Sequence, residues 1–237
     1  MKIKLFSTLL IVLSVLTFQA QTTETFETET SGSSSFTDNS QVFNITSQAQ
    51  GPFDIQTGYA NTGWSGSASD NRYIDNDGFA VANQAVQFTI SSSGSTPFRL
   101  NNLYLYLATS ANNINVTGTL TIVGKLGGVT QFTASSSSGF NTSLGTANGF
   151  TYINMATFGG SNNSTTNIDQ FVISTTTGIN YVALDAMNWS VVSTPTITTS
   201  GTLSAFTSCS GSVSSSQNFS SLLQQKLLKL ALKILNL

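Results

Sequence analysis

The densest group of possible metal ligands in the sequence lies between Asp70 and Gly78. This segment contains three carboxylates, those of Asp70, Asp75 and Asp77, together with two asparagines and a glycine. Hard oxygen ligands on a short turn are what Ca²⁺ requires, and glycine permits the tight bend. The spacing matches only part of an EF-hand loop, because Tyr73 stands where a further acid would be needed. A calcium site at Asp70, Asp75 and Asp77 is the functional hypothesis, and ordinary solvated loop carboxylates are the more common outcome for such a segment.

Three aromatic residues, Tyr59, Trp64 and Tyr73, lie in segments rich in Gly, Asn, Ser and Asp. A flat ring in such a loop can stack on the face of a sugar while neighbouring Asn and Asp side chains bind its hydroxyl groups. The alternative is structural, because loop aromatics also close the ends of β-sandwiches. Tyr104 and Tyr106 form a second candidate platform. The sequence therefore predicts ligand binding at Tyr59, Trp64 and Tyr73.

The 237 residues include no histidine. This excludes Ser-His-Asp and Cys-His nucleophiles and every His-ligated zinc or haem site. Cys209, the single cysteine, has no partner for an intrachain disulfide and no imidazole to activate it. Two carboxylates are enough for a glycosidase, but no pattern selects a pair among the acids. We expect a noncatalytic protein, with a glycan hydrolase as the less favoured alternative.

Charge is unevenly distributed along the chain. Residues 21–221 contain all ten acidic residues but only three of the eight basic ones. An acidic body disfavours phosphate backbones and anionic lipid as partners. Its polarity comes from Ser, Thr, Asn, Gln and Gly, mixed with residues typical of strands, as in an extracellular β-domain. We therefore expect no nucleic-acid partner.

Alternating apolar and polar residues predict strands over most of this body. In 98–107 three leucines share one face while Tyr104 and Tyr106 share the other, and 114–123 shows the same period of two. The pair Gly127-Gly128 predicts a hairpin turn into a strand at 129–134. Further strands are expected at 36–45, 86–90, 150–158, 168–174 and 181–192.

Seven or more short strands, with no helical periodicity between residues 21 and 193, predict an all-β protein. The expected architecture is an antiparallel β-sandwich. A jelly roll is the preferred topology, and an immunoglobulin-like strand order is the alternative.

The first twenty residues read as a secretory signal peptide. Lys2 and Lys4 precede an apolar stretch at 5–16, and a small residue, Ala20, follows at the expected cleavage position. An apolar stretch of about twelve residues is too short to span a bilayer, which needs ~20. A buried or anchoring helix is the alternative. We expect a secreted protein, extracellular or on the outer cell surface.

The composition changes again at Ser193-Thr194-Pro195, where we place a domain boundary after a sandwich at 21–193. Residues 194–221 have room for one or two strands but are too few to close a core, so they predict an incomplete repeat. Residues 222–237 carry a Leu/Lys pattern typical of an amphipathic helix on a membrane surface. The favoured interpretation is instead an out-of-frame tail that interrupts a longer protein, because an incomplete domain precedes it.

Four segments resemble the jelly-roll modules of secreted Bacteroidetes surface proteins; they are 25–27, 70–76, 118–124 and 181–189. The segments 204–209 and 216–219 resemble the first strands of the immunoglobulin-like repeats that follow such modules in adhesin-like proteins. The resemblance implies a multidomain cell-surface protein that is truncated here. It carries no catalytic identity.

The resemblance also implies a second calcium site. Many jelly-roll binding modules use an early Glu and a late-strand Asp as ligands, and Glu27 and Asp185 resemble that arrangement. Strand alternation predicts that Asp185 shares one face of its strand with Tyr181, Ala183, Met187 and Trp189. An ordinary hydrogen-bonded aspartate is the alternative.

Two functions stay open. The first is a noncatalytic attachment module of an adhesin-like protein. The second is a carbohydrate-binding module that takes an extracellular glycan or cell-surface polymer, for which Trp64 and Tyr73 should be exposed and coplanar.

Overall fold

The computed structural model describes residues 21–76, 78–192, 199–200 and 220–221. The chain divides into two compact units, Met1–Val192 and Ser193–Leu237. Within the second unit, strand β13 (Thr199–Ser200) pairs antiparallel with β14 (Ser220–Ser221). The predicted signal peptide and Leu/Lys tail, and the predicted repeat apart from these two strands, lie outside the described residues.

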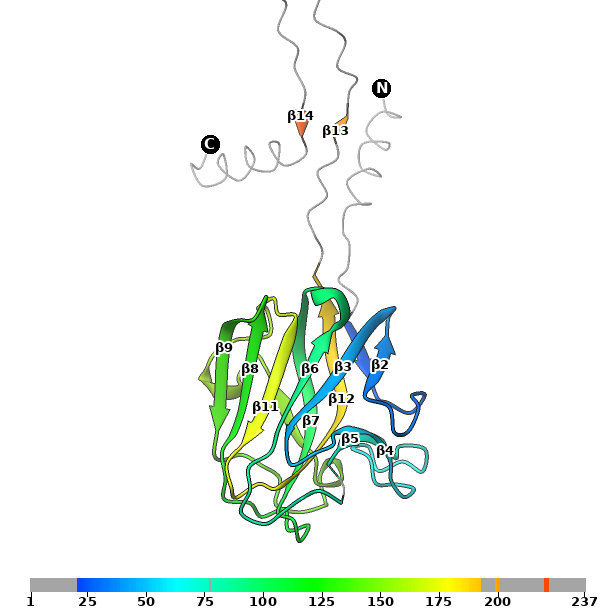
Figure 1. Ribbon diagram of the computed structural model, residues 1–237, viewed down its shortest axis with the longest axis vertical. Helices are drawn as coiled ribbons and strands as arrows, with labels where there is room; N and C mark the ends of the chain where they lie inside the picture. Colours follow the sequence, from blue (N-terminus) through cyan, green and yellow to red (C-terminus); the bar gives the residue numbers. More distant parts are fainter. Residues whose placement is uncertain (1–20, 77, 193–198, 201–219, 222–237) are drawn as a thin grey trace, which may run out of the picture. The chain divides into compact units, whose positions relative to one another are not determined.

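The described residues of the first unit form two six-stranded antiparallel sheets, which Figure 1 shows packed face to face. Sheet A has the order β10-β7-β12-β5-β4, with β1 also paired to β12. Its strands are β1 (Gln21–Glu24), β4 (Asp54–Thr57), β5 (Arg72–Asp75), β7 (Phe98–Ala108), β10 (Thr151–Asn154) and β12 (Tyr181–Val191). Sheet B has the order β2-β3-β6-β11-β8-β9. Its strands are β2 (Ser35–Asp38), β3 (Gln41–Ala49), β6 (Gln87–Ser92), β8 (Leu120–Leu126), β9 (Val129–Ser136) and β11 (Gln170–Thr175).

The predicted all-β antiparallel sandwich is confirmed. The helical elements among the described residues are three short 3₁₀ turns, η1 (Ser93–Ser95), η2 (Ala147–Gly149) and η3 (Phe158–Gly160). From β5 to β8, and again from β10 to β12, consecutive strands alternate between the two sheets, as they do in a jelly roll. Within the part of the chain that the structure describes, no helix is long and apolar enough to cross a bilayer.

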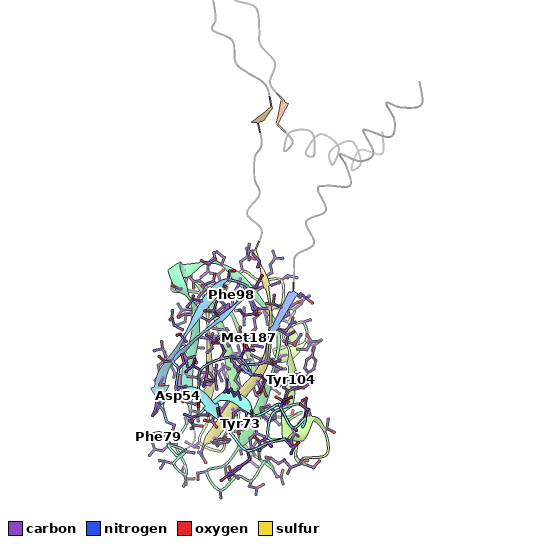
Figure 2. The ribbon with its side chains drawn as sticks, turned by 90° about the vertical axis from the view of Figure 1, so that its right-hand side faces the viewer. Asp54, Tyr73, Phe79, Phe98, Tyr104 and Met187 are labelled. Atoms are coloured by element: carbon purple, nitrogen blue, oxygen red, sulfur yellow. The ribbon has the colours of Figure 1, made fainter. Side chains whose placement is uncertain are left out.

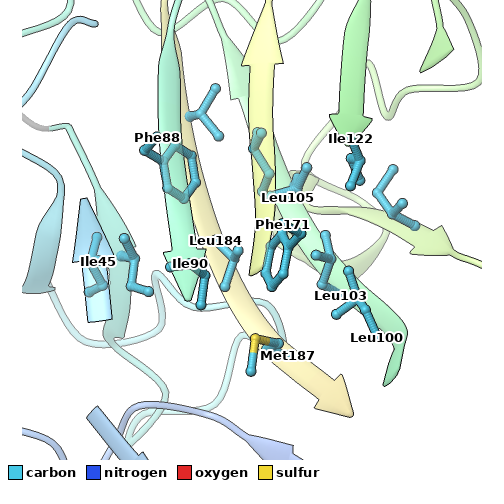
Figure 3. Packing of buried hydrophobic residues seen from close by; sticks show 14 of the residues in the cluster. Ile45, Phe88, Ile90, Leu100, Leu103, Leu105, Ile122, Phe171, Leu184 and Met187 are labelled. Carbon is cyan, nitrogen blue, oxygen red and sulfur yellow. The ribbon is translucent and has the colours of Figure 1, made fainter. Parts of the chain in front are cut away.

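The core lies between the inner faces of the sheets. In sheet A, Leu105, Leu184 and Ile74 stand opposite one another and are fully buried. Sheet B supplies Ile90 and Phe171, which are paired and equally buried. Figure 3 shows Leu105 and Leu184 of sheet A meeting Ile90 and Phe171 of sheet B in the space between the sheets. Alternation along each strand therefore sends one set of residues into the core and the other set to the outer faces.

Several strand predictions are confirmed, and others need correction. The strand at 98–107 and the hairpin at Gly127-Gly128 are present, and both glycines have positive φ, as such a turn requires. The segment 36–45 is a hairpin rather than one strand, because Asn39 and Ser40 adopt positive φ and reverse the chain. Residues 114–119 lie outside any strand, and β8 begins at Leu120.

Strand β12 also departs from simple alternation. Between Asp185 and Asn188 its pairing with β7 shifts by one residue, and Ala186 takes a positive φ of 45°. This is a β-bulge, which inserts one extra residue into a strand and changes the faces of those that follow. Asp185 shares the outer face with Ala183 as predicted. Met187 and Trp189, which were predicted to share that face, point into the core instead.

Candidate functional site

The outer face of sheet A carries aromatic side chains that do not belong to the hydrophobic core. Residues directly opposite one another in a sheet share a face and lie within contact distance. One row across the sheet consists of Tyr152, Tyr104 and Asp185. The next row consists of Tyr106, Ala183 and Asp75. Both rows face away from the core.

A cavity of about 310 Å³ opens on this face. The Tyr106 ring lies 5.5 Å from that of Phe150 and 5.9 Å from that of Tyr181, measured between centroids. Ala183 is small and leaves space between these rings. The complete lining is aromatic, amide, hydroxyl and aliphatic, and carries no charge: Asn61, Thr62, Tyr73, Tyr106, Asn112, Leu144, Asn148, Phe150, Tyr181 and Ala183.

Two of the cavity tyrosines are fixed by their hydroxyl groups. Tyr181 Oη donates to Asp75 Oδ2 at 2.7 Å, and Asp75 is itself only 2% exposed. Tyr73 Oη donates to Thr62 Oγ1 at 3.3 Å. Gly58 makes this second contact possible, because a Cβ atom there would lie 2.2 Å from Tyr73 Oη. The rings therefore keep their orientation without a ligand, which lowers the entropy that binding must remove.

The rim of the cavity joins two loops that are far apart in sequence. Asn148 adopts a positive φ of 51°, a conformation that asparagine tolerates. Its Nδ2 donates to the backbone oxygens of Asn61 at 2.7 Å and Gly63 at 3.1 Å. The loop between β4 and β5 is thereby held against the segment that precedes β10.

Trp64 lies beside the cavity rather than in it. Its ring stacks on Tyr104 with centroids 4.5 Å apart, and Tyr104 in turn contacts Tyr152 at 5.1 Å. Burial raises the pKa of the Tyr104 and Tyr106 hydroxyls, so both rings are neutral well above physiological pH. Trp64 is half-buried, and Tyr152 is half-exposed.

The three predicted glycan-binding residues therefore have different positions. Tyr73 lines the cavity, but it belongs to strand β5 rather than to a loop, and its ring meets Phe150 edge-on. Figure 2 labels Tyr73 on β5 and Tyr104 on β7. Tyr59 is 88% exposed and lies outside the cavity lining. Trp64 packs on Tyr104 instead of pairing with Tyr73 in one plane.

Beside the aromatic residues lies a group of three carboxylates, of which two are buried and Asp185 is the most enclosed. It is fully buried. Its Oδ2 accepts the Trp64 backbone N–H at 3.1 Å, and its Oδ1 accepts the Ala186 N–H at 2.7 Å. Burial raises the pKa of Asp185 to about 8, and the negative charges of Asp70 and Glu27 add to this effect against the two backbone N–H donors. The β-bulge places this carboxylate where water cannot compensate its charge.

Asp70 is the second member of the group. Its Oδ2 accepts the Ser65 backbone N–H at 2.5 Å, whereas its buried Oδ1 has no hydrogen-bond partner. Gly63 is pressed against it, because a Cβ atom at position 63 would lie 2.1 Å from that same Oδ1. An unpaired buried carboxylate oxygen is costly and calls for a ligand or a cation.

Glu27 is the third member. Its Oε1 accepts the backbone N–H groups of Asn71 and Arg72, both at 2.9 Å. The Arg72 guanidinium does not offset this carboxylate directly, since its Nη1 donates to the backbone oxygens of Glu27 and Glu29. Adjacent backbone amides at 64 and 65 thus hold Asp185 and Asp70, and those at 71 and 72 hold Glu27.

The structure groups the predicted metal ligands differently from the two sets that the sequence predicts. Residues 70–76 do not form one turn, because strand β5 rises about 3.3 Å per residue and keeps its two ends roughly 10 Å apart. Asp75 pairs with Tyr181 at the cavity, while Asp70 joins Glu27 and Asp185. Asp77 lies outside the described residues. Within those residues, no three His, Cys, Asp or Glu side chains converge closely enough to hold a metal by themselves, so a cation here would also need backbone, amide or water oxygens.

Sequence reasoning missed several of these residues. Tyr181 and Ala183 could have been found from their alternation with the core residues of β12, but Phe150 and Asn148 carry no such signal. Glu24 was also missed. It is 7% exposed, and burial raises its pKa to about 7, although its Oε1 accepts the Phe26 N–H.

Comparison with known proteins assigns no family. No family model matches the chain, and no curated protein matches it. Among solved structures, a DUF4465 family protein from Bacteroides caccae is similar at a TM-score of 0.41 and 12% identity, over 74% of this chain and 94% of that one.

Two further structures are similar at lower TM-scores. The K2 cleaved adhesin domain of Lys-gingipain has a TM-score of 0.33 and 15% identity, over 72% of this chain and 99% of that one. The catalytic domain of a GH87 alpha-1,3-glucanase has a TM-score of 0.27 and 14% identity, over 65% of this chain and 29% of that one. Likeness at this level says nothing about activity or ligand. The strand pairing itself defines the class, an all-β sandwich module with an aromatic outer face.

Proposed function

We propose that residues 21–192 form a noncatalytic attachment module that binds a neutral extracellular glycan on the outer face of sheet A. The observation that supports this most is the uncharged cavity around Tyr106 and Tyr181. Sugar rings present apolar C–H faces that pack on aromatic rings and hydroxyl groups that bond to amides. Both kinds of partner line this cavity.

The chemistry of the lining favours binding over hydrolysis. A glycosidase needs two carboxyl groups on opposite sides of the scissile bond. The cavity lining contains no carboxylate. Asp75, which accepts the Tyr181 hydroxyl, is buried. The glycan hydrolase remains the second candidate, and the same binding assays would reveal it through released sugars.

This assignment fits a secreted or cell-surface protein of the adhesin-like type. Attachment requires a stable scaffold with a preformed ligand face and no chemistry. The sandwich supplies the scaffold, and the hydroxyl bonds of Tyr73 and Tyr181 supply the preformed face.

The direct test is a panel of neutral soluble and insoluble polysaccharides, measured by pull-down and affinity electrophoresis with the whole chain. We expect at least one to bind, and Tyr181→Ala to weaken that binding about tenfold or more. Tyr59→Ala is the matched control, because it removes an exposed tyrosine outside the cavity and should leave affinity unchanged. Equal affinity of both variants and the parent protein would contradict the site, and sugar release would favour the hydrolase.

We further propose that Asp185 and Asp70, with Glu27 nearby, hold a structural Ca²⁺. The unpaired Oδ1 of Asp70 and the full burial of Asp185 support it, and the donors are hard oxygens of the kind that calcium prefers. The cation would offset charges that burial now penalises. It would also stiffen the loop at 63–70, which adjoins the cavity.

A bound cation stabilises only the native state. At a hundredfold excess over Kd the gain is about 2.7 kcal/mol, and for a domain of this size each ~1 kcal/mol moves the melting temperature by roughly 2–4 °C. Chelation by EDTA should therefore lower the melting temperature, and added CaCl₂ should restore it. An unchanged melt in EDTA, together with no calcium binding by calorimetry, would overturn this proposal.

A further inference from the structure

A second uncharged cavity, of about 400 Å³, lies at the β10 edge of the same sandwich. Phe140 and Phe158 lie in its lining, with Ser138 and Thr157 as hydroxyl donors. Tyr152 belongs to this lining as well. Ser135 and Ser136 of β9 also line it, so this cavity extends from the β10 edge of sheet A to sheet B. Both phenylalanines are partly buried against the core, and the lining again combines aromatic rings with hydroxyl groups.

Two clusters of rings lie between the cavities on the same face of sheet A. Tyr152 contacts Tyr104 at 5.1 Å between centroids, and Tyr104 contacts Trp64 at 4.5 Å. Tyr106 follows two residues later on the same strand and the same face, roughly 7 Å along β7. Tyr106 lines the first cavity and contacts Tyr181 at 5.9 Å. The rings therefore extend from β12 across β7 to β10, with one step of roughly 7 Å between Tyr104 and Tyr106.

We propose that this face binds a linear neutral glycan lying across sheet A, with sugar units in both cavities, rather than a single terminal sugar. The inference rests on the proposed glycan-binding function and names its ligand class. The path from Tyr181 to Tyr152 is much longer than one sugar ring, and Tyr152 is 49% exposed at its far end. Neither lining contains a charged side chain, so the uncharged chain is favoured over an acidic polysaccharide.

The test compares short and long ligands of the same sugar. The probes are cello-, xylo-, manno- and laminari-oligosaccharides of two and of six units, titrated calorimetrically into the whole chain. We expect the six-unit ligand of the binding series to exceed the two-unit ligand in affinity by about tenfold or more. Tyr152→Ala should remove that advantage and leave two-unit affinity unchanged, whereas Tyr181→Ala should weaken both.

The controls separate the possible failures. Phe79→Ala removes another half-exposed aromatic outside both cavities and should change neither affinity. Tyr152 is solvent-facing, so the melting temperature of its variant should match the parent protein. Equal affinity for two and six units, or a Tyr152→Ala variant that keeps the advantage, would overturn the extended-ligand proposal alone. Absence of binding by every probe and polysaccharide would overturn the glycan-binding function with it.

Discussion

The outer faces of the two sheets differ, although their inner faces are alike. Across sheet B the outward row is Thr46, Thr89, Val172, Val123 and Thr133. A shallow depression of about 420 Å³ there is lined mainly by Thr, Gln, Ser and Val. Across sheet A the corresponding rows hold tyrosines and buried aspartates. Both inner faces consist of Ile, Leu and Phe packed into one core.

The comparison shows which features folding requires. Short polar and β-branched side chains suffice for the solvent-facing side of a sheet, as sheet B demonstrates. The outward row of sheet B has neither clustered tyrosines nor a fully buried carboxylate, and its inner face packs into the same core. Folding therefore does not require these groups on the outer face of sheet A. Burial disfavours the charged form of Asp185. The concentration of these groups on one face supports the ligand-binding surface that we propose.

The largest expected effect concerns the buried acid. Because burial raises the pKa of Asp185 from 3.8 to about 8, the cation-free native state keeps a proton that the unfolded chain has released. Stability should therefore fall, by several kcal/mol, as the pH rises from about 4 to 8. Glu24, with a pKa raised from 4.5 to about 7, contributes in the same direction.

Asp185→Asn isolates this effect. In EDTA the variant should lose less stability than the parent between pH 5 and pH 8, measured by urea denaturation, because it has no carboxyl group to titrate. Its absolute stability is not the readout, since its Nδ2 must face one of the two N–H groups that Asp185 accepts. Added CaCl₂ should stabilise the parent more than the variant, which lacks a ligand. An identical pH slope in the two proteins would contradict the assignment.

The second prediction concerns the contact between Gly63 and Asp70. Gly63→Ala should cost about 1–3 kcal/mol, because the added methyl group would overlap the Asp70 carboxylate and its backbone oxygen. Gly145→Ala is the matched control. It has open space and no positive φ, so its stability should change by less than about 1 kcal/mol. Chemical denaturation of the two variants side by side distinguishes a required glycine from an incidental one.

The third prediction contrasts the faces directly. Tyr106→Ala should weaken glycan binding about tenfold, whereas Thr133→Ala and Gln87→Ala on sheet B should not change it. Affinity electrophoresis with the polysaccharide that binds best is sufficient. Loss of affinity in a sheet B variant that melts normally would move the site to the other face.

The smallest expected effect comes from the hydroxyl group of Tyr181, which orients the ring but leaves its contact area unchanged. Tyr181→Phe keeps the ring but removes the hydroxyl that donates to Asp75 Oδ2. We expect a loss of affinity of only a few-fold, since a single hydrogen bond contributes about 0.5–1.5 kcal/mol. A loss as large as that of Tyr181→Ala would mean that the hydroxyl, not the ring, contacts the ligand.

The fold was largely predictable from the sequence, whereas the site was predictable only in part. Alternation identifies Leu103, Leu105 and Tyr104 correctly because burial of one face determines strand patterning. It fails after Asp185, because a bulge leaves no mark in residue polarity. It also fails for Asp70 and Asp75, since an extended strand and a ligand-binding turn share the same composition.

The cavity itself depends on contacts between distant segments. Asn148 reaches Asn61, and Phe150 meets Tyr73, but no local pattern links these pairs. Such contacts follow from strand order, which hydrophobic periodicity does not specify. For that reason the sequence indicated Trp64 and Tyr59, which are loop aromatics, ahead of Tyr106, and it did not indicate Tyr181.

We propose above that the ligand lies on the outer face of sheet A. The most direct measurement is NMR mapping of the chain during titration with the polysaccharide or oligosaccharide that binds best. If the ligand binds there, we expect the largest chemical-shift changes in the ring signals of Tyr73, Tyr106 and Tyr181 and in the side-chain amide of Asn148. Shifts confined to sheet B, around Gln87, Thr89 and Val172, would contradict it.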